Sequence, residues 1–359
     1  AFTAHPDSKW LDPAKAHQSP TDKKLWYNAL DLGIQGQAWH DLKHPYDRLP
    51  AKAEKQIDTG IWNLSHQSAG LSVEFITDSP TISARWSLRK RSLALHHMPS
   101  TGASGLDLYV KDQGTWRWIA IGIPLAQKDN TANLIPDAPQ GIHHYRLILP
   151  LYNGIESLNI GIAPNTKIRS PEKQSAAHKP IVFYGTSITQ GATVSRTGMA
   201  YPAILSRRLH RPTINLGFSG RGKMELEMAS LLAEINAAAY VLDGLPNMDP
   251  DLLRERFIPF IRALREAHPH TPIILVENIE YQGSWFSKSR AEHIPMNQTL
   301  HQEIDKLKAL GIRNISIVPS KKLLGKDGLG TVDGTHPNDL GMLRIANALE
   351  PAIRAAINP

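Results

Sequence analysis

The hydrophobic pattern of this 359-residue chain changes its period once, near residue 180. Before that point apolar residues alternate with polar ones, which is the period of a half-buried β-strand. After it, short apolar runs are separated by segments with helical spacing, which is typical of strands that alternate with helices. A chain of this length is also too long for one ordinary compact domain. We therefore expect two domains of different class.

The first half is predicted to fold as a β-sandwich with a jelly-roll-like path. Its strand-like segments are apolar at every second position, and Asp78-Ser79-Pro80 and Asp112-Gln113-Gly114 mark turns between them. Short strands separated by turn signals are typical of two packed antiparallel sheets. The expected strands cover residues 71–75, 82–88, 106–110, 116–120, 143–149 and 157–162.

The second half is predicted to be a three-layer α/β sandwich with a five-stranded, parallel, flavodoxin-like sheet. Strands that alternate with helices form a parallel sheet covered on both faces, with the functional loops at the carboxyl ends of the strands. The expected strands are 181–184, 213–216, 239–242, 273–276 and 314–318, and the expected helices are 201–209, 225–236, 252–267, 291–310 and 339–357.

The best candidate for a linker is a polar stretch before residue 180 that contains Pro171. Polar segments with proline between two periodic regions are typical of connections. We place the sandwich, as an accessory domain, at residues 1–165, the linker at 166–179 and the catalytic α/β domain at 180–359.

The composition excludes several kinds of site and partner. The chain has no cysteine, which rules out disulfides, zinc–thiolate sites and a thiol nucleophile. Its 40 basic and 33 acidic residues give a net charge of +7, but they are spread out, whereas nucleic-acid binding needs a basic stripe or a known module. No apolar run approaches the roughly 20 residues that span a bilayer. We expect neither a nucleic-acid partner nor a membrane span.

Adjacent histidines are poor candidates for a metal site. His96-His97 and His143-His144 lie in the sandwich half, and neighbouring residues of a strand point to opposite faces. The chain also lacks a His-Glu-x-x-His motif. We therefore expect no metal.

A lone serine follows the first strand of the α/β half. Ser187 stands in Tyr184-Gly185-Thr186-Ser187-Ile188, directly after the apolar run Pro180-Ile181-Val182-Phe183. A strand that ends at a small-residue turn with a serine is where α/β enzymes expose a nucleophile. Ser187 is therefore a candidate for attack on an acyl carbonyl.

A carboxylate and an imidazole stand three residues apart near the end of the chain, in Asp333-Gly334-Thr335-His336-Pro337. A serine nucleophile needs a base, and the base needs a group that orients it. His336 fits the base and Asp333 the orienting carboxylate. The same pair would also suit an ordinary turn and helix cap, so both interpretations stay open on this fragment alone.

Two further strand ends offer hydrogen-bond donors for an oxyanion. Asn215-Leu216-Gly217-Phe218-Ser219-Gly220 follows the second strand, and Asp243-Gly244-Leu245-Pro246-Asn247 follows the third. The amide of Gly220 and the side chain of Asn247 could converge with the Ser187 amide on one carbonyl oxygen. Glycine and asparagine dominate ordinary turns, so each fragment is weak evidence by itself.

The four fragments, taken in order, resemble the SGNH hydrolases, the superfamily of GDSL-like esterases. The resemblance implies that Ser187 is the nucleophile, that Gly220 and Asn247 are oxyanion-hole donors, and that His336 is the base with Asp333 beside it. The sandwich half resembles the domain that precedes this fold in one branch, because its signature Gly-x-Asp-Leu-Tyr stands here as Gly105-Leu106-Asp107-Leu108-Tyr109.

The chain departs from the family pattern at two positions. Thr186 replaces the usual Asp before the nucleophile, and Arg221 follows Gly220 where Asn or Asp is usual. Arg221 could tune substrate charge or be an ordinary solvated side chain. Glu277-Asn278 ends the fourth strand, where it could contact substrate or only cap a loop.

The resemblance implies a serine esterase without a cofactor that hydrolyses short acyl esters, acetyl esters above all. We expect a carbohydrate O-acetylesterase acting on a glycan or small-molecule ester. The alternatives are a short-chain carboxylesterase, a lysophospholipase or a thioesterase. A glycan esterase suits a periplasmic or secreted location, although the sequence does not exclude the cytoplasm and indicates no oligomeric state.

Two interpretations lie outside this class. Residues 217–223 fit the phosphate-loop spacing G-x-x-x-x-G-K, but Met224 stands where Ser or Thr should bind magnesium. A non-catalytic glycan-binding protein is the second, because seven of the eight tryptophans lie in the first half. Most tryptophans of a β-sandwich are core residues, so we expect about two-thirds of these to be buried.

Overall fold

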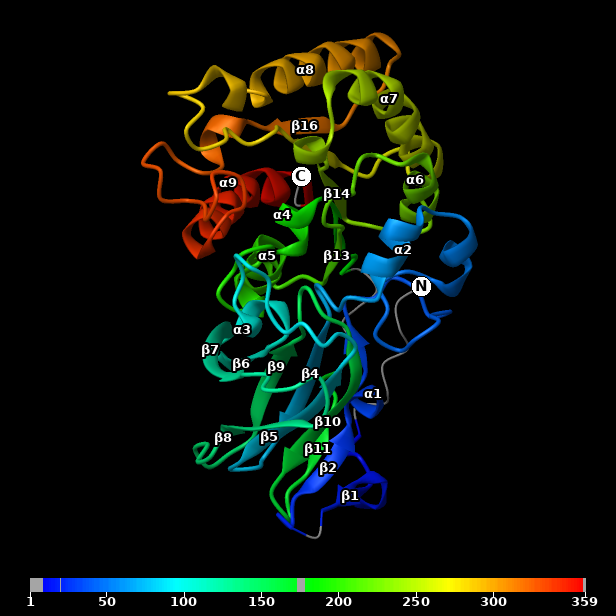
Figure 1. Cartoon of the computed structure of the whole chain (residues 1–359). Helices are drawn as coiled ribbons and strands as arrows, with labels where there is room; N and C mark the ends of the chain where they lie inside the picture. Colours follow the sequence, from blue (N-terminus) through cyan, green and yellow to red (C-terminus); the bar gives the residue numbers. More distant parts are fainter. Residues whose placement is uncertain (1–8, 20, 173–177, 358–359) are drawn as a thin grey trace.

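The structure is a computed structural model that describes residues 9–19, 21–172 and 178–357. Figure 1 shows two layered parts stacked end to end, with the antiparallel strands at one end and the parallel sheet with its helices at the other. The two predicted fold classes are confirmed. Residues 173–177 of the predicted linker lie outside the described residues. Among the described helices, none is long and apolar enough to cross a membrane.

The sandwich consists of two antiparallel sheets. The first has the strand order β1-β2-β10-β5-β8, with β1 (His17–Gln18), β2 (Leu25–Asn28), β5 (Ile82–Leu88), β8 (Asn130–Ile135) and β10 (Ile155–Ile162). The second has the order β11-β4-β9-β6-β7, with β4 (Ser72–Thr77), β6 (Leu106–Asp112), β7 (Thr115–Gly122), β9 (His143–Ile148) and β11 (Ile168–Arg169), while β3 (Ile34–Gln35) pairs with β4. Short helical turns connect them: η1 (Pro13–Lys15), α1 (Ala29–Leu32) and α3 (Ser100–Ala103).

The core of the sandwich forms where the inward side chains of the two sheets meet. Phe75 of β4 is paired in register with Tyr145 of β9, and their rings stack 5.3 Å apart. Trp86 of β5 is among the largest fully buried side chains. Five of the seven tryptophans in this half are buried, as expected, and two of them, Trp39 and Trp62, lie in a core of the parallel domain. β11 falls within the range predicted as a linker, yet it pairs with β4, so the sheet continues to Arg169.

The parallel sheet has the order β13-β12-β14-β15-β16 with all neighbours parallel, which is the predicted flavodoxin-like order. Its strands are β12 (Ile181–Gly185), β13 (Thr213–Gly217), β14 (Ala239–Asp243), β15 (Ile273–Val276) and β16 (Ile315–Val318). The helices are α4 (Ser187–Gln190), α5 (Tyr201–Leu209), α6 (Leu226–Leu232), α7 (Pro250–Ala267), α8 (His293–Ala309) and α9 (Asp339–Ile357). Single 3-10 turns lie between them: η3 (Thr197–Met199), η4 (Leu245–Asn247), η5 (Lys288–Arg290) and η6 (Ser320–Lys322).

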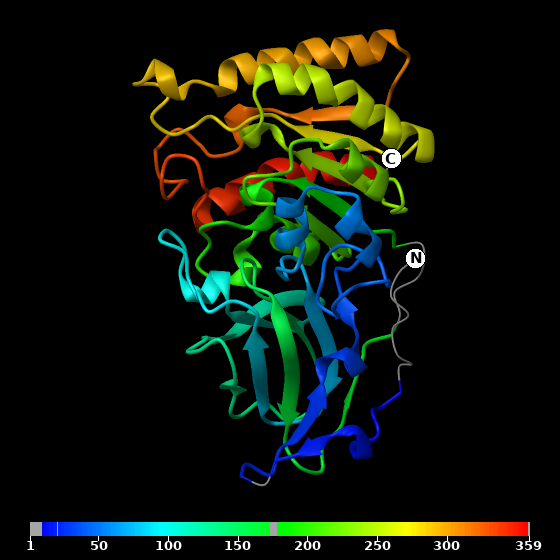
Figure 2. The same ribbon diagram turned by 45° about the vertical axis from the view of Figure 1, so that its right-hand side comes forward.

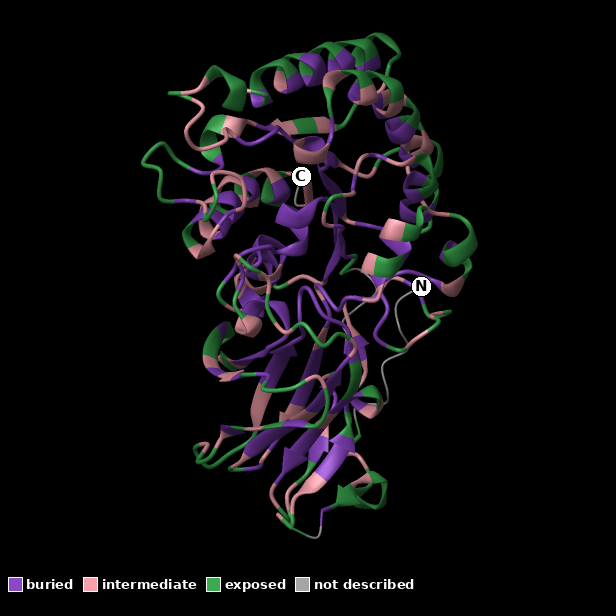
Figure 3. Ribbon diagram, in the orientation of Figure 1, coloured by how far each residue is buried: buried purple, intermediate pink, exposed green. Residues whose placement is uncertain are grey.

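Both faces of this sheet are buried because its side chains alternate between two apolar cores. Ile181 and Phe183 of β12 face the core that α5 and α9 complete, whereas Val182 and Tyr184 face the core of α6, α7 and α8. Figure 2 shows α9 on one side of the sheet and α7 with α8 on the other. Figure 3 shows the outer sides of α7 and α8 exposed, and the edge strand β16 only partly buried, whereas β12, β13, β14 and β15 are buried throughout. The carboxyl ends of the strands are therefore left for the site.

The helix α7 begins two residues earlier than predicted. The side chain of Asp249 accepts hydrogen bonds from the amides of Asp251 and Leu252, and Pro250 occupies the first helical position. Both are common start signals of a helix. The helices α5 and α9 have the predicted bounds, whereas α6 ends at Leu232, four residues before the predicted end.

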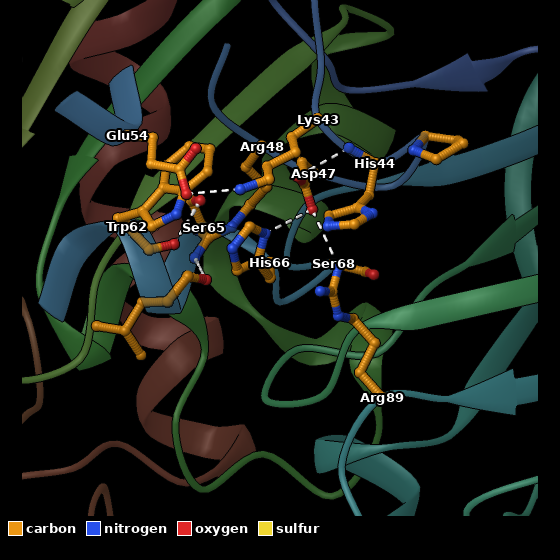
Figure 4. A network of polar contacts seen from close by, with 12 residues as sticks. Lys43, His44, Asp47, Arg48, Glu54, Trp62, Ser65, His66, Ser68 and Arg89 are labelled. Carbon is orange, nitrogen blue, oxygen red and sulfur yellow. Dashed lines mark hydrogen bonds and ion pairs between the residues drawn. The ribbon is translucent and has the colours of Figure 1, made fainter. Parts of the chain in front are cut away.

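The chain between β3 and β4 leaves the sandwich and packs against the parallel domain. This segment carries η2 (Ala51–Lys55) and α2 (Thr59–Ser65). Leu49 and Ile61 are fully buried in the core that α6 and α7 also fill. Arg48, which Figure 4 shows beside Asp47 and His66, is 2% exposed. It donates hydrogen bonds to the carbonyl oxygens of Leu64, Asn215 and Gly217 at 2.8, 3.2 and 2.7 Å. The segment therefore fastens the sandwich to the carboxyl end of β13.

The Gly-x-Asp-Leu-Tyr motif forms a second junction between the two parts. Asp107 is fully buried, and its Oδ2 accepts hydrogen bonds from Arg196 Nη1 and the Gly198 amide, each at 2.9 Å. Its Oδ1 accepts a hydrogen bond from Trp118 Nε1 at 2.5 Å. The Tyr109 hydroxyl accepts a hydrogen bond from the same Arg196 atom at 2.6 Å. The motif thus holds the loop between α4 and α5 against the sandwich.

Candidate active site

The turn after β12 presents Ser187 at the start of the one-turn helix α4. The Thr186 hydroxyl accepts a hydrogen bond from the Ile188 amide at 3.2 Å, which caps the turn. Gly191 ends it with a φ of 107°, a conformation that favours glycine. Ser187 is 7% exposed. The sharp strand-to-helix turn therefore fixes the serine at the sheet edge where parallel α/β folds place their sites.

The structure brings Ser187, His336 and Asp333 into one hydrogen-bonded chain. Ser187 Oγ lies 3.0 Å from His336 Nε2, and His336 Nδ1 lies 2.7 Å from Asp333 Oδ2. An ionised carboxylate can only accept, so the ring proton belongs on Nδ1 and leaves Nε2 free to accept the serine proton. This arrangement is suited to general-base activation of the hydroxyl.

Asp333 is held by its own loop as well as by the histidine ring. Its Oδ1 accepts hydrogen bonds from the amides of Thr335 and His336 at 2.9 and 2.7 Å. Partial burial would raise the pKa of Asp333, but the His336 amide and ring and the Thr335 amide together lower it to about 2. The carboxylate is therefore ionised throughout the physiological range.

The loop of Phe218–Gly222 lies against the end of β12, beside Ser187. The Phe218 amide donates to the Gly185 carbonyl at 2.9 Å, and a Cβ on Gly222 would come within 2.0 Å of the same oxygen. Among the described residues, the amides of Ser187 and Gly220 have no hydrogen-bond acceptor. An oxyanion site requires unpaired N–H groups, and these two lie on adjoining strand-end turns.

Asn247 reaches the same loop from the end of β14. Its Nδ2 donates to the Arg221 carbonyl at 2.6 Å, which uses one of its two amide protons. Gly244 approaches closely, because a Cβ there would lie 2.5 Å from the Gly222 carbonyl oxygen. The loop and the β14 end are therefore packed together, as the predicted convergence of donors requires. The donor roles of Gly220 and Asn247 stay predictions.

Arg221 pairs with the segment between β3 and β4 that packs against the parallel domain. Its Nε lies 3.0 Å from Asp58 Oδ1, and both side chains are partly exposed. The same carboxylate caps α2 by accepting from the Gly60 amide at 2.9 Å. Arg221 therefore has an acidic partner within the protein, and any contact with substrate is a prediction.

Glu277 and Asn278 are buried and bonded to protein groups. The Glu277 carboxylate accepts from the Ser320 amide at 2.8 Å and lies 2.7 Å from His301 Nε2. Burial would raise the pKa of Glu277, but these contacts lower it. Asn278 Oδ1 accepts from the Tyr281 hydroxyl at 3.2 Å. These contacts fit the loop-capping interpretation; contact with substrate stays a prediction.

The phosphate-loop interpretation is wrong. α6 begins at Leu226, three residues after Lys223, instead of directly after the lysine. The Lys223 amide donates to both carboxylate oxygens of Glu225 at 3.0 Å, and the Tyr184 hydroxyl donates to the same carboxylate. The partly buried carboxylate of Glu225 therefore stands where a phosphate would have to bind.

The sandwich also contacts the nucleophile turn, which the sequence did not indicate. The Tyr152 hydroxyl donates to the Ser187 carbonyl at 3.3 Å. Gln190 Nε2 donates to the Leu151 carbonyl at 2.9 Å and to the Gln67 side chain, while its Oε1 accepts from the Ser219 amide at 2.9 Å. One glutamine therefore links the sandwich, α4 and the Phe218–Gly222 loop.

His97 is a site residue that the sequence prediction missed. The rule for neighbouring strand residues was applied to His96-His97, but the pair forms a turn in which the two rings stack 4.2 Å apart. The His97 ring lies 5.2 Å from the His336 ring at an interplanar angle of 76°. The error arose because alternation was assumed for a segment that is not a strand.

Two clusters in the described part of the chain could hold a metal ion by spacing alone: His44 with Asp47 and His66, and His97 with Asp333 and His336. In the first, Asp47 Oδ1 already lies 2.8 Å from His66 Nδ1 and 3.5 Å from Arg89 Nη1 (Figure 4). In the second, both nitrogens of His336 are engaged by Ser187 and Asp333. The positive charge of Arg89 disfavours a cation in the first cluster, and the hydrogen bonds of His336 disfavour one in the second.

The comparisons with known proteins agree over nearly the whole chain. The GDSL-like Lipase/Acylhydrolase family matches residues 178–354, and the N-terminus of SGNH-hydro-type esterases, the GxDLY family, matches residues 24–168. A GDSL-like lipase from Bacteroides ovatus ATCC 8483 is 35% identical, with a TM-score of 0.87 over 92% of this chain and 97% of that one. A comparison with curated proteins gave no match.

More distant solved structures share the fold. The salicylyl-acyltransferase SsfX3 from a tetracycline biosynthetic pathway is 17% identical, with a TM-score of 0.75 over 92% of this chain and 97% of that one. A family two carbohydrate esterase from Cellvibrio japonicus is 14% identical, with a TM-score of 0.60 over 93% and 98%. The chain therefore belongs to the GDSL-like lipase/acylhydrolase family and is an SGNH-type ester hydrolase with the N-terminal Gly-x-Asp-Leu-Tyr domain.

Proposed function

We propose that the protein is a serine esterase in which Ser187 attacks the ester carbonyl and His336 acts first as base and then as acid. The observation that carries the proposal is the hydrogen-bonded chain from Ser187 through His336 to Asp333, with distances of 3.0 and 2.7 Å. In the first step the serine proton moves to His336 Nε2 while Oγ bonds to the carbonyl carbon. Asp333 stays ionised and stabilises the imidazolium that forms.

The carbonyl oxygen becomes an oxyanion, which the amides of Ser187 and Gly220 and the side chain of Asn247 bind. The two unpaired amides lie at the carboxyl ends of neighbouring strands, which supports this assignment. Removing one such donor costs about 10²- to 10³-fold in turnover. The C–O bond then breaks, and His336 gives its proton to the leaving alcohol.

Water completes the cycle. The water oxygen attacks the acyl-serine carbonyl carbon while His336 takes a proton from that water. When the second oxyanion collapses, the bond between the acyl carbon and Ser187 Oγ breaks, and His336 returns the proton to Oγ. The products are one carboxylic acid and one alcohol. No cofactor takes part in this sequence.

The proposed substrate is an O-acetylated carbohydrate. The support is the fold that the chain shares with carbohydrate esterases, among them an acetyl xylan esterase from Butyrivibrio proteoclasticus. A short-chain carboxylesterase, a lysophospholipase and a thioesterase use the same chemistry and differ only in the alcohol or thiol that leaves. Because acetylated glycans of this kind are mostly extracellular, we propose a periplasmic or secreted location, which fractionation of the source cells would test.

The test is acetate release by the wild type and by Ser187→Ala. We expect the wild type to release acetate from 4-nitrophenyl acetate and from acetylated polysaccharides, and Ser187→Ala to release none above the uncatalysed rate. Ser230→Ala, on the exposed side of α6, is the matched control and should keep full activity. Near-normal activity of Ser187→Ala would contradict the mechanism, whereas activity on simple esters alone would contradict only the carbohydrate substrate.

A further inference from the structure

The sandwich domain places one turn on the catalytic face, between β5 and α3. The Leu95 amide donates to the Met98 carbonyl at 3.0 Å, and the Met98 amide donates back to Leu95 at 3.1 Å. Met98 is 2% exposed and lies in the core that covers the α5 and α9 face of the parallel sheet. The turn is therefore anchored in the catalytic domain, and its two central residues, His96 and His97, are held in place.

The rings of His96, His97 and His336 form a row of contacts that ends at the proposed catalytic base. His96 and His97 stack with an interplanar angle of 12°, and the His97 ring meets the His336 ring edge to face. One polar atom from each of His97, Asp333 and His336 lies within 4.8 Å of the others. Because both nitrogens of His336 are engaged by Ser187 and Asp333, His97 takes no part in the proton relay.

His97 is a polar side chain without a protein partner. Among the described residues, its Nδ1 is enclosed and has no hydrogen bond, and its Nε2 has none either but is not enclosed. The pKa of His97 is lowered, chiefly by burial and then by the neighbouring His336 and His96 rings, although Asp333 acts in the opposite direction. A neutral imidazole has one donor and one acceptor. The open Nε2, left unpaired beside a reacting centre, is free to bond a group of the substrate.

We propose that His97 is a specificity residue that hydrogen-bonds a hydroxyl group of the alcohol moiety, next to the ester oxygen. The leaving oxygen must approach His336 Nε2 to receive its proton, so the alcohol moiety lies beside the His336 ring and within reach of His97. Of the two ring nitrogens only Nε2 is open to a ligand, and a hydroxyl group can bond it as donor or as acceptor. The proposal rests on the proposed function and assigns the preference for a polyhydroxylated alcohol to the sandwich domain.

A site built to bind a hydroxyl group discriminates against the analogue that lacks it, because its polar groups are then left unpaired. The test therefore compares two esters that differ by one hydroxyl group: cyclohexyl acetate and the monoacetate of trans-1,2-cyclohexanediol. We expect the wild type to have a kcat/KM about tenfold or more higher for the diol monoacetate. In His97→Phe, which keeps a flat ring against His336, this ratio should fall to about one. His97→Asn, which keeps a donor and an acceptor, should retain part of the preference.

His96→Phe is the matched control, because the exposed His96 ring stacks on His97 without reaching His336. It should keep the wild-type ratio, and thermal unfolding should show that all variants are folded. Equal losses on both esters in His97→Phe would overturn the proposal, since His97 would then act only by positioning His336. A wild type without a preference would overturn it too. Hydrolysis of neither ester by the wild type would instead count against the proposed function.

Discussion

The two oxygens of Asp333 have separate tasks. Oδ2 holds the His336 ring, and Oδ1 holds the backbone of the loop through the amides of Thr335 and His336. Gln282 holds the loop in turn, because its backbone N–H donates to the Gly334 carbonyl oxygen at 2.9 Å. The carboxylate thus fixes both the orientation of the ring and the position of the residue that carries it.

Replacing Asp333 with Asn should lower kcat by about 10²- to 10⁴-fold. An amide is neutral and can present its NH₂ group to Nδ1, which would favour the tautomer with its proton on Nε2 and would stabilise the imidazolium less. The change should appear in kcat on 4-nitrophenyl acetate more than in KM. Asp305→Asn, at an exposed ion pair on α8, is the control and should behave like the wild type. An Asp333→Asn variant with at least half of the wild-type kcat would refute the assigned role.

Local sequence signals singled out the three residues of the hydrogen-bonded chain, because Ser187 follows an apolar strand directly and Asp333 and His336 share one short loop. Joining the two fragments into one site required the resemblance to a known family, since Ser187 and His336 are 149 positions apart. His97 could not be found in this way. Its contact with His336 joins residues 239 positions apart and depends on how the sandwich docks on the parallel sheet.

At the scale of elements, close backbone packing positions the loop of Phe218–Gly222. Gly222 has a φ of 72°, and its Cα faces the Gly185 carbonyl at the end of β12. No side chain fits there, because even a Cβ would lie 2.0 Å from that oxygen. The loop can therefore lie next to Ser187 only with glycine at this position.

Gly222→Ala should push the loop away from β12 and lower kcat by about 10²-fold, since the Gly220 amide would move out of line. Gly220→Ala is the matched comparison. Its φ of 69° is also strained for alanine, at a cost of about 1–2 kcal/mol. A Cβ there meets nothing within 4 Å, so its loss of kcat should be smaller. Kinetics together with circular dichroism would check both, and equal activities of the two variants would count against this account of the loop.

Within the sandwich, the pair β4 and β9 carries a buried charge cluster. Glu74 and Arg146 are paired in register, with Arg146 Nε 2.8 Å and His144 Nε2 2.9 Å from the carboxylate. Burial would raise the pKa of Glu74, but Arg146 and His144 lower it to about 2 from 4.5. A depressed pKa stabilises the folded state above the unfolded pKa, and that contribution is lost as the pH falls from 4.5 toward 2.

Glu74→Gln should therefore lower the free energy of unfolding by about 3 kcal/mol at pH 7, and the difference from wild type should shrink below pH 4.5. Urea unfolding at several pH values measures it. Glu54→Gln, which breaks an exposed pair with Lys43, should change little at any pH. A deficit of Glu74→Gln that stays constant down to pH 3 would show that the ion pair is not its cause.

Strands and helices were predictable to within a few residues because their apolar periods are strong. The start of α7 was placed late because its first turn contains Pro250 and Asp251, which interrupt the apolar pattern although they suit a helix start. The strand β11 was taken for a linker because it has only two residues, too few to show an alternating pattern in the sequence. Its pairing with β4 can be seen only in the structure.

At the scale of the whole molecule, the sandwich and the parallel domain share apolar cores and polar contacts. Leu49 and Ile61 lie in one core with α6 and α7, and Leu151 and Met98 lie in another with α5 and α9. Arg48 and Asp107 add buried hydrogen bonds between the two parts. The Gly-x-Asp-Leu-Tyr motif could be recognised in the sequence. Its hydrogen bonds to the parallel domain could not be predicted, because Arg196 and Gly198 are about 90 residues away from Asp107.

Such a junction should make the chain unfold as one unit, so calorimetry of the wild type should show a single transition. Arg48→Met removes three hydrogen bonds to carbonyl groups, two of them buried, and should lower the free energy of unfolding by about 3–5 kcal/mol. It should also lower kcat, because Arg48 holds the end of β13 that leads to the Phe218–Gly222 loop. Arg117→Met, at an exposed ion pair, is the control. Two well-separated transitions in the wild type would contradict the shared core.

The most direct test of the central claim is covalent labelling with a fluorophosphonate, which loses fluoride as a serine nucleophile bonds to phosphorus. Intact mass and peptide mass spectrometry should find one adduct per chain, on Ser187. Labelling should be absent in Ser187→Ala and at least about 10²-fold slower in His336→Ala. An adduct on another residue, or labelling of Ser187→Ala at the wild-type rate, would show that Ser187 is not the nucleophile.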